Sequence, residues 1–151
     1  NLVKSKNFIF KVAGDGEEKE NLNKLIKKFN LTKKVKLLGW CTNVEKLYKN
    51  SHLFIHASHQ EGFPNSIVEA LNYNLPVIAS NCKGGTKEIL NYGKGGDLFP
   101  VNNHKKLASK IENFIKNQSK LKKKLKFARK HINKYTVENN YNKFVKVLNS
   151  V

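Results

Sequence analysis

Two glutamates with seven residues between them are the side chains of this sequence that are best suited to chemistry. Glu61 lies in the segment Ser58 to Asn65 (SHQEGFPN), and Glu69 lies just over one turn inside the helix expected to follow it. An ionised carboxylate only accepts hydrogen bonds, so it pairs naturally with the hydroxyl groups of a sugar or a ribose. The same spacing also fits two carboxylates that simply face water, and both interpretations stay open here.

The segment between the glutamates also has features that favour the binding of an anion. Gly62 lets the backbone approach a ligand closely, and Asn65 is expected to cap the helix that begins there. A helix N-terminus offers free N–H groups and a partial positive charge, which suit a phosphate. The segment therefore predicts a phosphate site beside two carboxylates that can bind hydroxyl groups.

The elements expected around this segment alternate between strand and helix. Apolar strands are predicted at Phe8 to Ala13, Val35 to Leu38, His52 to Ser58, Pro76 to Ser80 and Asp97 to Phe99. The helices between them are predicted around Leu22 to Phe29, Val44 to Tyr48, Asn65 to Tyr73 and Lys87 to Asn91. Apolar strands separated by single helices indicate a parallel sheet covered on both faces. The predicted fold class is therefore α/β, a doubly wound parallel sheet.

Only helices are expected after Pro100. Their apolar stripes are Leu107, Ala108, Ile111, Phe114 and Ile115; then Leu121, Leu125, Ala128 and Ile132; then Tyr141, Phe144, Val145 and Leu148. Ligands of an open parallel sheet bind at the carboxyl ends of its strands. Four loops lie there, at Gly14 to Glu17, Gly39 to Asn43, Ser58 to Asn65 and Asn81 to Thr86.

Length and composition limit the class of protein. A chain of 151 residues with 39% hydrophobic residues can bury one core, so one domain is expected. No apolar run is long enough to span a membrane and no secretory signal is visible, so a soluble, cytoplasmic protein is expected. Cys41 and Cys82 are interpreted as ordinary thiols. The net charge of +18 favours nucleic acid, acidic lipid or phosphates as partners, although scattered lysines also describe a merely solvated surface.

Other chemistries find little support. His52, His56 and His59 are not joined by a set of carboxylates, so no metal site is expected. The turn Gly14-Asp15-Gly16 lacks the rest of a dinucleotide fingerprint, and neither a Walker sequence nor a G-x-S-x-G elbow is present. Trp40 either stacks on a base or packs at the core or its rim, and packing is the expected role.

The sequence EGFPNSIVEAL, followed by PVIAS and GGTKEIL, closely resembles the C-terminal domain of retaining glycosyltransferases of family 4, also called group 1, which have the GT-B fold. The order of a GDG turn, a VKLLG strand and an LAxxI helix agrees with that family. The resemblance extends from Phe8 to Leu148.

The resemblance implies roles for individual residues. Glu61 would contact the hydroxyls of the donor hexose beside the reaction centre, and Glu69 would hold the ribose. The backbone of Gly62, Phe63, Pro64, Asn65 and Ser66 would face the sugar and the diphosphate. Gly39, Trp40, Cys41 and Thr42 would lie against the base, and Gly14 and Gly16 would complete the nucleotide site. Gly84 and Gly85 would serve backbone geometry first and ligand contact second.

Two departures from the family are visible. Asn74 stands where the family usually has glycine at a left-handed helix end, which is a mild change. The family's first strand and helix of this domain, with an Arg and a Lys that clamp the diphosphate, have no counterpart before Asn1, nor does the acceptor-binding N-terminal domain. The chain is therefore expected to be a nucleotide-sugar-binding domain that does not catalyse transfer alone.

The resemblance predicts a hexosyltransferase of polysaccharide biosynthesis, including lipopolysaccharide or capsule. Its ligand would be a nucleoside-diphosphate sugar, with a UDP-sugar favoured, and it would need no metal cofactor. The acceptor would be a glycan or a lipid-linked glycan, bound through the N-terminal domain. The basic tail predicts contact with the inner face of an anionic membrane, and nucleic acid is not expected as a partner. The alternative is a non-catalytic basic module that binds nucleic acid or an anionic membrane.

Overall fold

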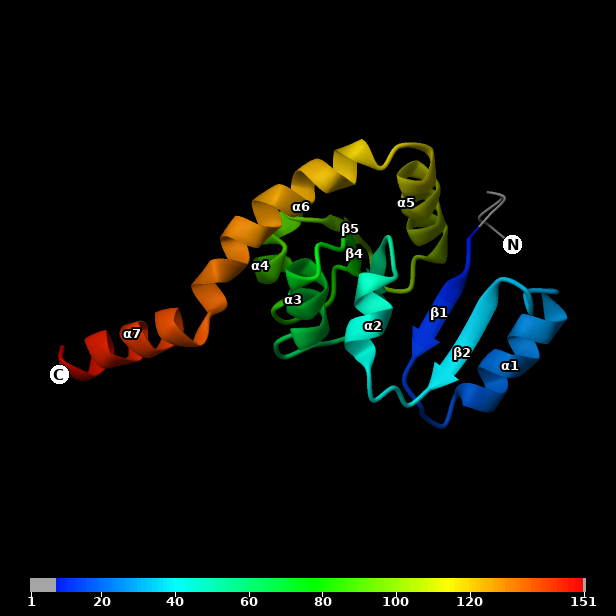
Figure 1. The fold of residues 1–151 in the computed structure, drawn as a ribbon, viewed down its shortest axis with the longest axis horizontal. Helices are drawn as coiled ribbons and strands as arrows, with labels where there is room; N and C mark the ends of the chain where they lie inside the picture. Colours follow the sequence, from blue (N-terminus) through cyan, green and yellow to red (C-terminus); the bar gives the residue numbers. More distant parts are fainter. Residues whose placement is uncertain (1–7, 151) are drawn as a thin grey trace. The chain divides into compact units, whose positions relative to one another are not determined.

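The computed structural model describes residues 8–150, which form two compact units (Figure 1). Unit 1 comprises the described residues up to Asn50, and unit 2 comprises those from Ser51 onward. Every strand pair in both units is parallel, and the strands are followed by helices. The structure thus confirms the predicted α/β class and the helical C-terminal segment.

Unit 1 contains two strand-helix pairs, β1 (Phe10–Ala13), α1 (Lys19–Lys28), β2 (Val35–Gly39) and α2 (Val44–Lys49). Val12 of β1 pairs with Leu37 of β2, and the register shifts before Ala13, which pairs with Gly39. The predicted stripe of α1 forms but is not buried, since Leu22, Leu25 and Phe29 remain 40–48% exposed. A sheet of two short strands offers too little apolar surface to cover such a helix.

Unit 2 contains a three-stranded sheet in the order β3-β4-β5, with bounds Phe54–His56, Val77–Ser80 and Asp97–Phe99. The central strand β4 is buried at all four residues, as expected for a strand with neighbours on both sides. Helix α3 (Asn65–Asn72) leads into β4 through Asn74, whose φ of 61° is the left-handed conformation predicted for it. Between β4 and β5 lie α4 (Thr86–Ile89) and the 3-10 turn η1 (Asn91–Gly93).

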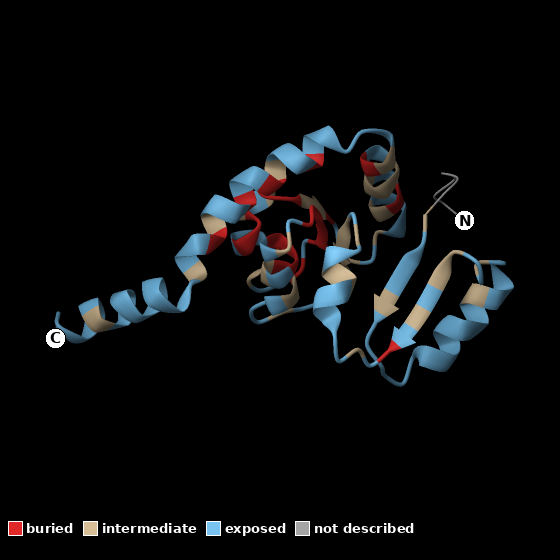
Figure 2. Cartoon of the chain, viewed as in Figure 1, coloured by how far each residue is buried: buried red, intermediate tan, exposed pale blue. Residues whose placement is uncertain are grey.

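The C-terminal helices are α5 (His104–Lys116), α6 (Ser119–Ile132), the turn η2 (Asn133–Tyr135) and α7 (Val137–Leu148). Helix α5 packs on β4 and β5, and α6 packs on α3 and α4. The predicted stripe of α6 is entirely buried, whereas α7 buries none of its residues and exposes Tyr141 and Phe144 (Figure 2). Among residues 8–150, no helix combines the length and the apolar character that crossing a membrane requires.

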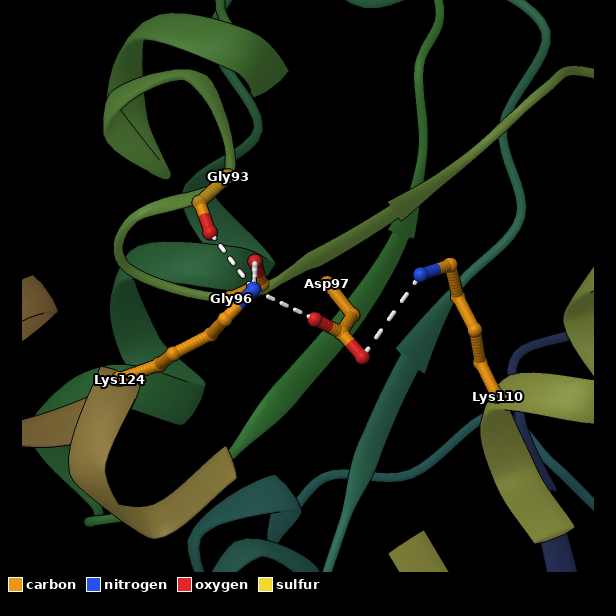
Figure 3. A network of polar contacts seen from close by, with 5 residues as sticks. All are labelled: Gly93, Gly96, Asp97, Lys110 and Lys124. Atoms are coloured by element: carbon orange, nitrogen blue, oxygen red, sulfur yellow. Dashed lines mark hydrogen bonds and ion pairs between the residues drawn. The ribbon is translucent and has the colours of Figure 1, made fainter. Parts of the chain in front are cut away.

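A polar network fixes α6 at the amino end of β5 (Figure 3). The Lys124 ammonium donates to the carbonyl oxygens of Gly93 and Gly96, at 2.8 and 3.2 Å, and to Asp97 Oδ1 at 2.6 Å. The Lys110 ammonium lies 3.7 Å from Asp97 Oδ2. All polar groups of this network face one another, and it lies at the strand end opposite to the predicted site, so its role is structural.

Candidate functional site

In unit 2, the loop after β3 and the loop after β4 are bonded to each other at the carboxyl ends of these adjacent strands. The Glu61 N–H donates to the Lys83 carbonyl at 3.0 Å, and the Gly85 N–H donates to the Gly62 carbonyl at 3.0 Å. These bonds continue the parallel pairing of the strands and fix the backbone on which Glu61 is carried.

Gly84 makes this close approach of the two loops feasible. Its φ is 106°, and a Cβ built on it would lie 1.5 Å from the Glu61 carbonyl oxygen. A side chain at this position would both strain the backbone and force the loops apart. The prediction that Gly84 serves backbone geometry is confirmed.

Ser80 anchors the start of the loop that carries Glu61. Its buried hydroxyl donates to the Ser58 carbonyl at 2.6 Å, and the Ser58 hydroxyl donates to the Gln60 carbonyl at 2.8 Å. This role of Ser80 was not predicted from the sequence. Its only signal is a polar residue that ends an otherwise apolar strand, and this signal does not name the partner.

The Glu61 carboxylate pairs with the last residue of β3. His56 Nε2 lies 3.0 Å from Glu61 Oε1, and the two side chains are 11% and 28% exposed. From the sequence, His56 was weighed as a metal ligand and no metal site was expected; its contact with Glu61 was not predicted. Among residues 8–150, no group of three or more His, Cys, Asp or Glu is placed to hold a metal ion.

Helix α3 begins directly after the Glu61 loop, but Asn65 does not cap it. The N-cap residue is Pro64, and no side-chain cap hydrogen bond forms. Asn65 is already the first helical residue, one position too late for its side chain to reach the free N–H groups. Pro64 is fully buried, and the Phe63 ring packs edge-on against Tyr135 at 5.3 Å between ring centroids. The loop is therefore fixed by packing rather than by a cap.

Glu69 and Ser66 lie on this same helix. Helix α3 buries Ile67, Ala70 and Leu71, and it leaves Glu69 exposed and Ser66 half-buried. The structure thus brings the predicted residues from Glu61 to Ser66 together at one helix N-terminus. A helix of this length concentrates N–H groups and partial positive charge at that end, so an anion is favoured there.

The predicted residues of unit 1 form a second group, at the carboxyl ends of β1 and β2. The Gly14 N–H donates to the Gly39 carbonyl at 2.8 Å, and both glycines have positive φ. Trp40 is 81% exposed, so the expected packing at the core or its rim is wrong. Trp40, Cys41 and Thr42 line one pocket of about 590 Å³, to which Lys11 and Lys46 also contribute. An exposed indole with two cations nearby suits an aromatic anion.

The turn with Gly14 and Gly16 lines a smaller pocket of unit 1, of about 260 Å³. Asp15 lies between these glycines and accepts from Lys19 Nζ at 2.8 Å and from the Gly16 N–H at 2.9 Å. The hydrogen bond from Lys19, followed by that from Gly16, lowers the pKa of the Asp15 carboxyl below its ordinary value. These two hydrogen bonds hold the Asp15 side chain against the turn.

Known proteins resemble the chain over most of its length. The family model described as "Glycosyl transferases group 1" matches residues 1–131. The poly(ribitol-phosphate) alpha-N-acetylglucosaminyltransferase of Staphylococcus aureus is 30% identical over 151 residues, which cover 99% of this chain and 31% of that protein. The N-acetylgalactosamine-N,N'-diacetylbacillosaminyl-diphospho-undecaprenol 4-alpha-N-acetylgalactosaminyltransferase of Campylobacter jejuni is 32% identical over 115 residues, which cover 76% of this chain and 31% of that protein.

Solved structures of glycosyltransferases have a similar fold over most of this chain. Anabaena Alr3699/HepE in complex with UDP matches with a TM-score of 0.85 and 25% identity, over 95% of this chain and 41% of that chain. The same protein in complex with UDP-glucose matches with a TM-score of 0.83 and 26% identity. The chain spans between 20% and 32% of the length of the curated relatives it matches.

Proposed function

Because the chain belongs to the glycosyl transferases group 1 family, we propose that it is the donor-binding part of a retaining hexosyltransferase. The donor would be a nucleoside-diphosphate sugar, with a UDP-sugar as the first candidate. The acceptor would be a glycan or a lipid-linked glycan. Support for UDP comes from the Anabaena complexes with UDP and UDP-glucose, and support for the acceptor comes from the names of the Staphylococcus and Campylobacter relatives.

The observation that carries this proposal is the fixed Glu61 loop at the N-terminus of α3. A carboxylate, a set of backbone groups and a helix N-terminus occur there within six residues, Glu61 to Ser66. The helix end would stabilise the negative charge of the diphosphate, and that charge grows as the sugar leaves. The Glu61 carboxylate would accept from hexose hydroxyls, and Glu69 would accept from the ribose.

Unit 1 would supply contacts to the nucleotide. We propose that Gly39, Trp40, Cys41 and Thr42 contact the base and that Gly14 and Gly16 present backbone to the nucleotide. Support comes from the pocket that Trp40, Cys41 and Thr42 line together. The chemistry of such a site requires no resident metal, because helix N-termini and cationic side chains can meet the phosphate charge.

Titration calorimetry with UDP and UDP-glucose tests the proposal. We expect Glu69→Ala to weaken the binding of both ligands by about 1 to 3 kcal/mol, the cost of a charge-assisted hydrogen bond. Glu61→Ala should weaken UDP-glucose and leave UDP nearly unchanged. Glu138→Ala, on the exposed helix α7, is the matched control and should change neither. Equal losses for both ligands in Glu61→Ala would contradict its assignment to the hexose.

We further propose that the protein works in the cytoplasm, at the inner face of the membrane. Helix α6 buries its apolar stripe and exposes six basic side chains, Lys120, Lys122, Lys123, Lys126, Arg129 and Lys130. Glu112 is the only acidic residue between His104 and Tyr135. An anionic leaflet attracts such a cluster with about 1 kcal/mol per basic residue near the surface.

Co-sedimentation with vesicles tests this attachment. We expect binding to vesicles with anionic lipid that disappears at high salt, and no binding to neutral vesicles. Replacing Lys122, Lys126 and Arg129 with Gln should weaken it, whereas the matched replacement of Lys24, Lys27 and Lys28 on α1 should not. Equal binding to neutral and anionic vesicles would instead assign the attachment to the exposed apolar side chains of α7.

A further inference from the structure

The contact between His56 and Glu61 joins a rigid strand to the proposed donor loop. His56 is the last residue of β3, where it pairs with Ala79 of the buried strand β4. Glu61 follows five residues later, and the bond to the Lys83 carbonyl fixes its backbone. The remaining freedom of Glu61 is that of its side chain, and the ring of His56 lies 3.0 Å from its carboxylate.

The chemistry of the contact determines which ring nitrogen carries the proton. A carboxylate oxygen only accepts, so Nε2 of His56, which lies 3.0 Å from Oε1 of Glu61, must carry a proton for this close contact to be favourable. Within the described part of the chain, the other ring nitrogen, Nδ1, is buried and has no hydrogen-bond partner. Glu61 is therefore the one polar partner that the described residues offer this ring. The largely covered imidazole thus has one polar contact, with Glu61, and does not belong to a wider hydrogen-bond network of the described residues.

We propose that His56 is a positioning residue that holds the Glu61 carboxylate ready for the donor sugar. This inference rests on the function proposed above. By occupying Oε1, His56 selects one conformer of a flexible side chain and leaves Oε2 to accept from a hexose hydroxyl. A preordered carboxylate loses less conformational entropy when the sugar binds, so affinity for the sugar is gained without a direct contact from His56.

The alternative is a pair that only stabilises the fold. The two roles differ in what the substitutions change. A structural role predicts equal effects of His56 substitutions on UDP and UDP-glucose, whether or not Glu61 is present. A positioning role predicts an effect on UDP-glucose alone, and only while Glu61 is there to be positioned.

A double-mutant cycle on the 151-residue chain separates these roles, with calorimetric affinities for UDP and UDP-glucose as the readout. We expect His56→Leu to weaken the binding of UDP-glucose about fivefold to tenfold, as for one lost polar contact, and to leave the binding of UDP unchanged. His56→Gln should recover most of the loss, because its amide can donate from near the position of Nε2. In the Glu61→Ala background, His56→Leu should have no further effect. His52→Leu, at an exposed neighbouring histidine, is the control.

An NMR measurement tests the pair without any ligand. Long-range proton–nitrogen spectra should show the His56 ring protonated at Nε2, and Glu61→Ala should change that pattern while His52 and His59 keep theirs. A pattern that is indifferent to Glu61→Ala, or additive losses in the cycle, would overturn the positioning role. If the unmodified chain bound neither UDP nor UDP-glucose while the NMR pattern was as expected, the result would instead count against the proposed function.

Discussion

Units 1 and 2 are built from the same kinds of element but differ in how much apolar surface they bury. Of residues 8–50 only Gly39 is buried, whereas unit 2 contains a core in which Ile67, Leu71 and Ile78 are fully buried (Figure 2). Strand β4 has a strand on each side and helices packed on it, whereas within residues 8–50 the strands β1 and β2 pair only with each other. The two units therefore differ in burial because unit 2 has more strands and helices packed against one another. The apolar patterns of their sequences are equally clear.

The same contrast extends to the two groups of predicted site residues. The Glu61 loop is supported by a buried proline, a buried serine and a glycine contact to the neighbouring loop. The loops of unit 1 are supported mainly by the bond between Gly14 and Gly39 and by the exposed pair of Asp15 and Lys19. We therefore expect the Glu61 loop to be rigid before a ligand arrives, and the loops of unit 1 to gain order when a ligand binds to them.

The largest expected effect concerns two leucines at equivalent places in their helices. Leu71→Ala in α3 should lower the free energy of unfolding of unit 2 by about 2 to 5 kcal/mol, because it empties a fully buried site. Leu25→Ala in α1, where the leucine is 47% exposed, should cost about 1 kcal/mol or less. Since both changes replace a helical leucine, helix propensity cancels. Hydrogen exchange of the strand amides measures the stability of each unit separately. Equal losses of stability in the two variants would refute the claim that unit 2 buries its apolar side chains more completely than unit 1.

Two glycines provide the next comparison. Gly84→Ala should cost about 3 kcal/mol, since its Cβ would meet the Glu61 carbonyl in addition to the strain of a positive φ. Gly14→Ala in unit 1 has a φ of 129° but nothing within 4 Å of the new Cβ, so only the strain of about 1 to 3 kcal/mol applies. Urea unfolding measures both. If Gly14→Ala were more destabilising than Gly84→Ala, the loops of unit 2 would not be the more closely packed of the two sets.

The charged networks of the two units should differ less in their contribution to stability than the leucines and glycines do. Lys124→Met removes three hydrogen bonds of a partly buried ammonium, and we expect a loss of about 1 to 2 kcal/mol after allowing for its solvent contact. Lys19→Met removes the exposed pair with Asp15 and should not shift the unfolding midpoint measurably. Both replacements keep the length of the side chain. Thermal unfolding at low and high salt measures both variants. A clear drop of the unfolding midpoint in Lys19→Met, largest at low salt, would contradict the expectation that the pair of Lys19 and Asp15 adds little stability.

The positions of strands and helices could be predicted from the sequence because local pattern determines them. The stripe of Leu121, Leu125, Ala128 and Ile132 is buried as its spacing predicts, and Asn74 adopts the left-handed conformation expected at a helix end. The stripe of Leu22, Leu25 and Phe29 follows the same rule and yet is exposed. A periodic pattern identifies the face that a helix can bury, but burial also requires a surface to receive it.

The position of the loop that carries the candidate site could be predicted from the sequence, but the contacts within this loop could not. The loop from Ser58 to Asn65 was placed correctly at a strand end, because parallel strands present their carboxyl ends to ligands. The contact of His56 with Glu61 depends on where β3 ends, and the hydrogen bond of Ser80 depends on which strand lies beside it. The helix start differed from expectation by one residue, which was enough to deprive Asn65 of its capping role. Each of these details depends on register, which local pattern does not fix.

The smallest expected effect is the pH dependence of the turn in unit 1. The pKa of Asp15 is lowered in the folded chain, by the hydrogen bond from Lys19 first and by that from Gly16 second. A carboxyl with a lowered pKa stabilises the folded state above its unfolded pKa, about 3.9 for Asp, and loses that contribution as the pH falls through the folded value.

We therefore expect this contribution to be intact well above the unfolded pKa of about 3.9 and to disappear as the pH falls through the lower pKa of the folded state. A carbon-detected NMR titration of the Asp15 carboxyl measures the folded pKa directly. Lys19→Met should raise that pKa toward its ordinary value, while the Gly16 N–H keeps part of the shift. If the pKa of Asp15 did not respond to Lys19→Met, the turn would owe its order to the backbone alone. Unit 1 would then resemble unit 2 in being fixed by its main chain, and the contrast between the two groups of site residues would narrow.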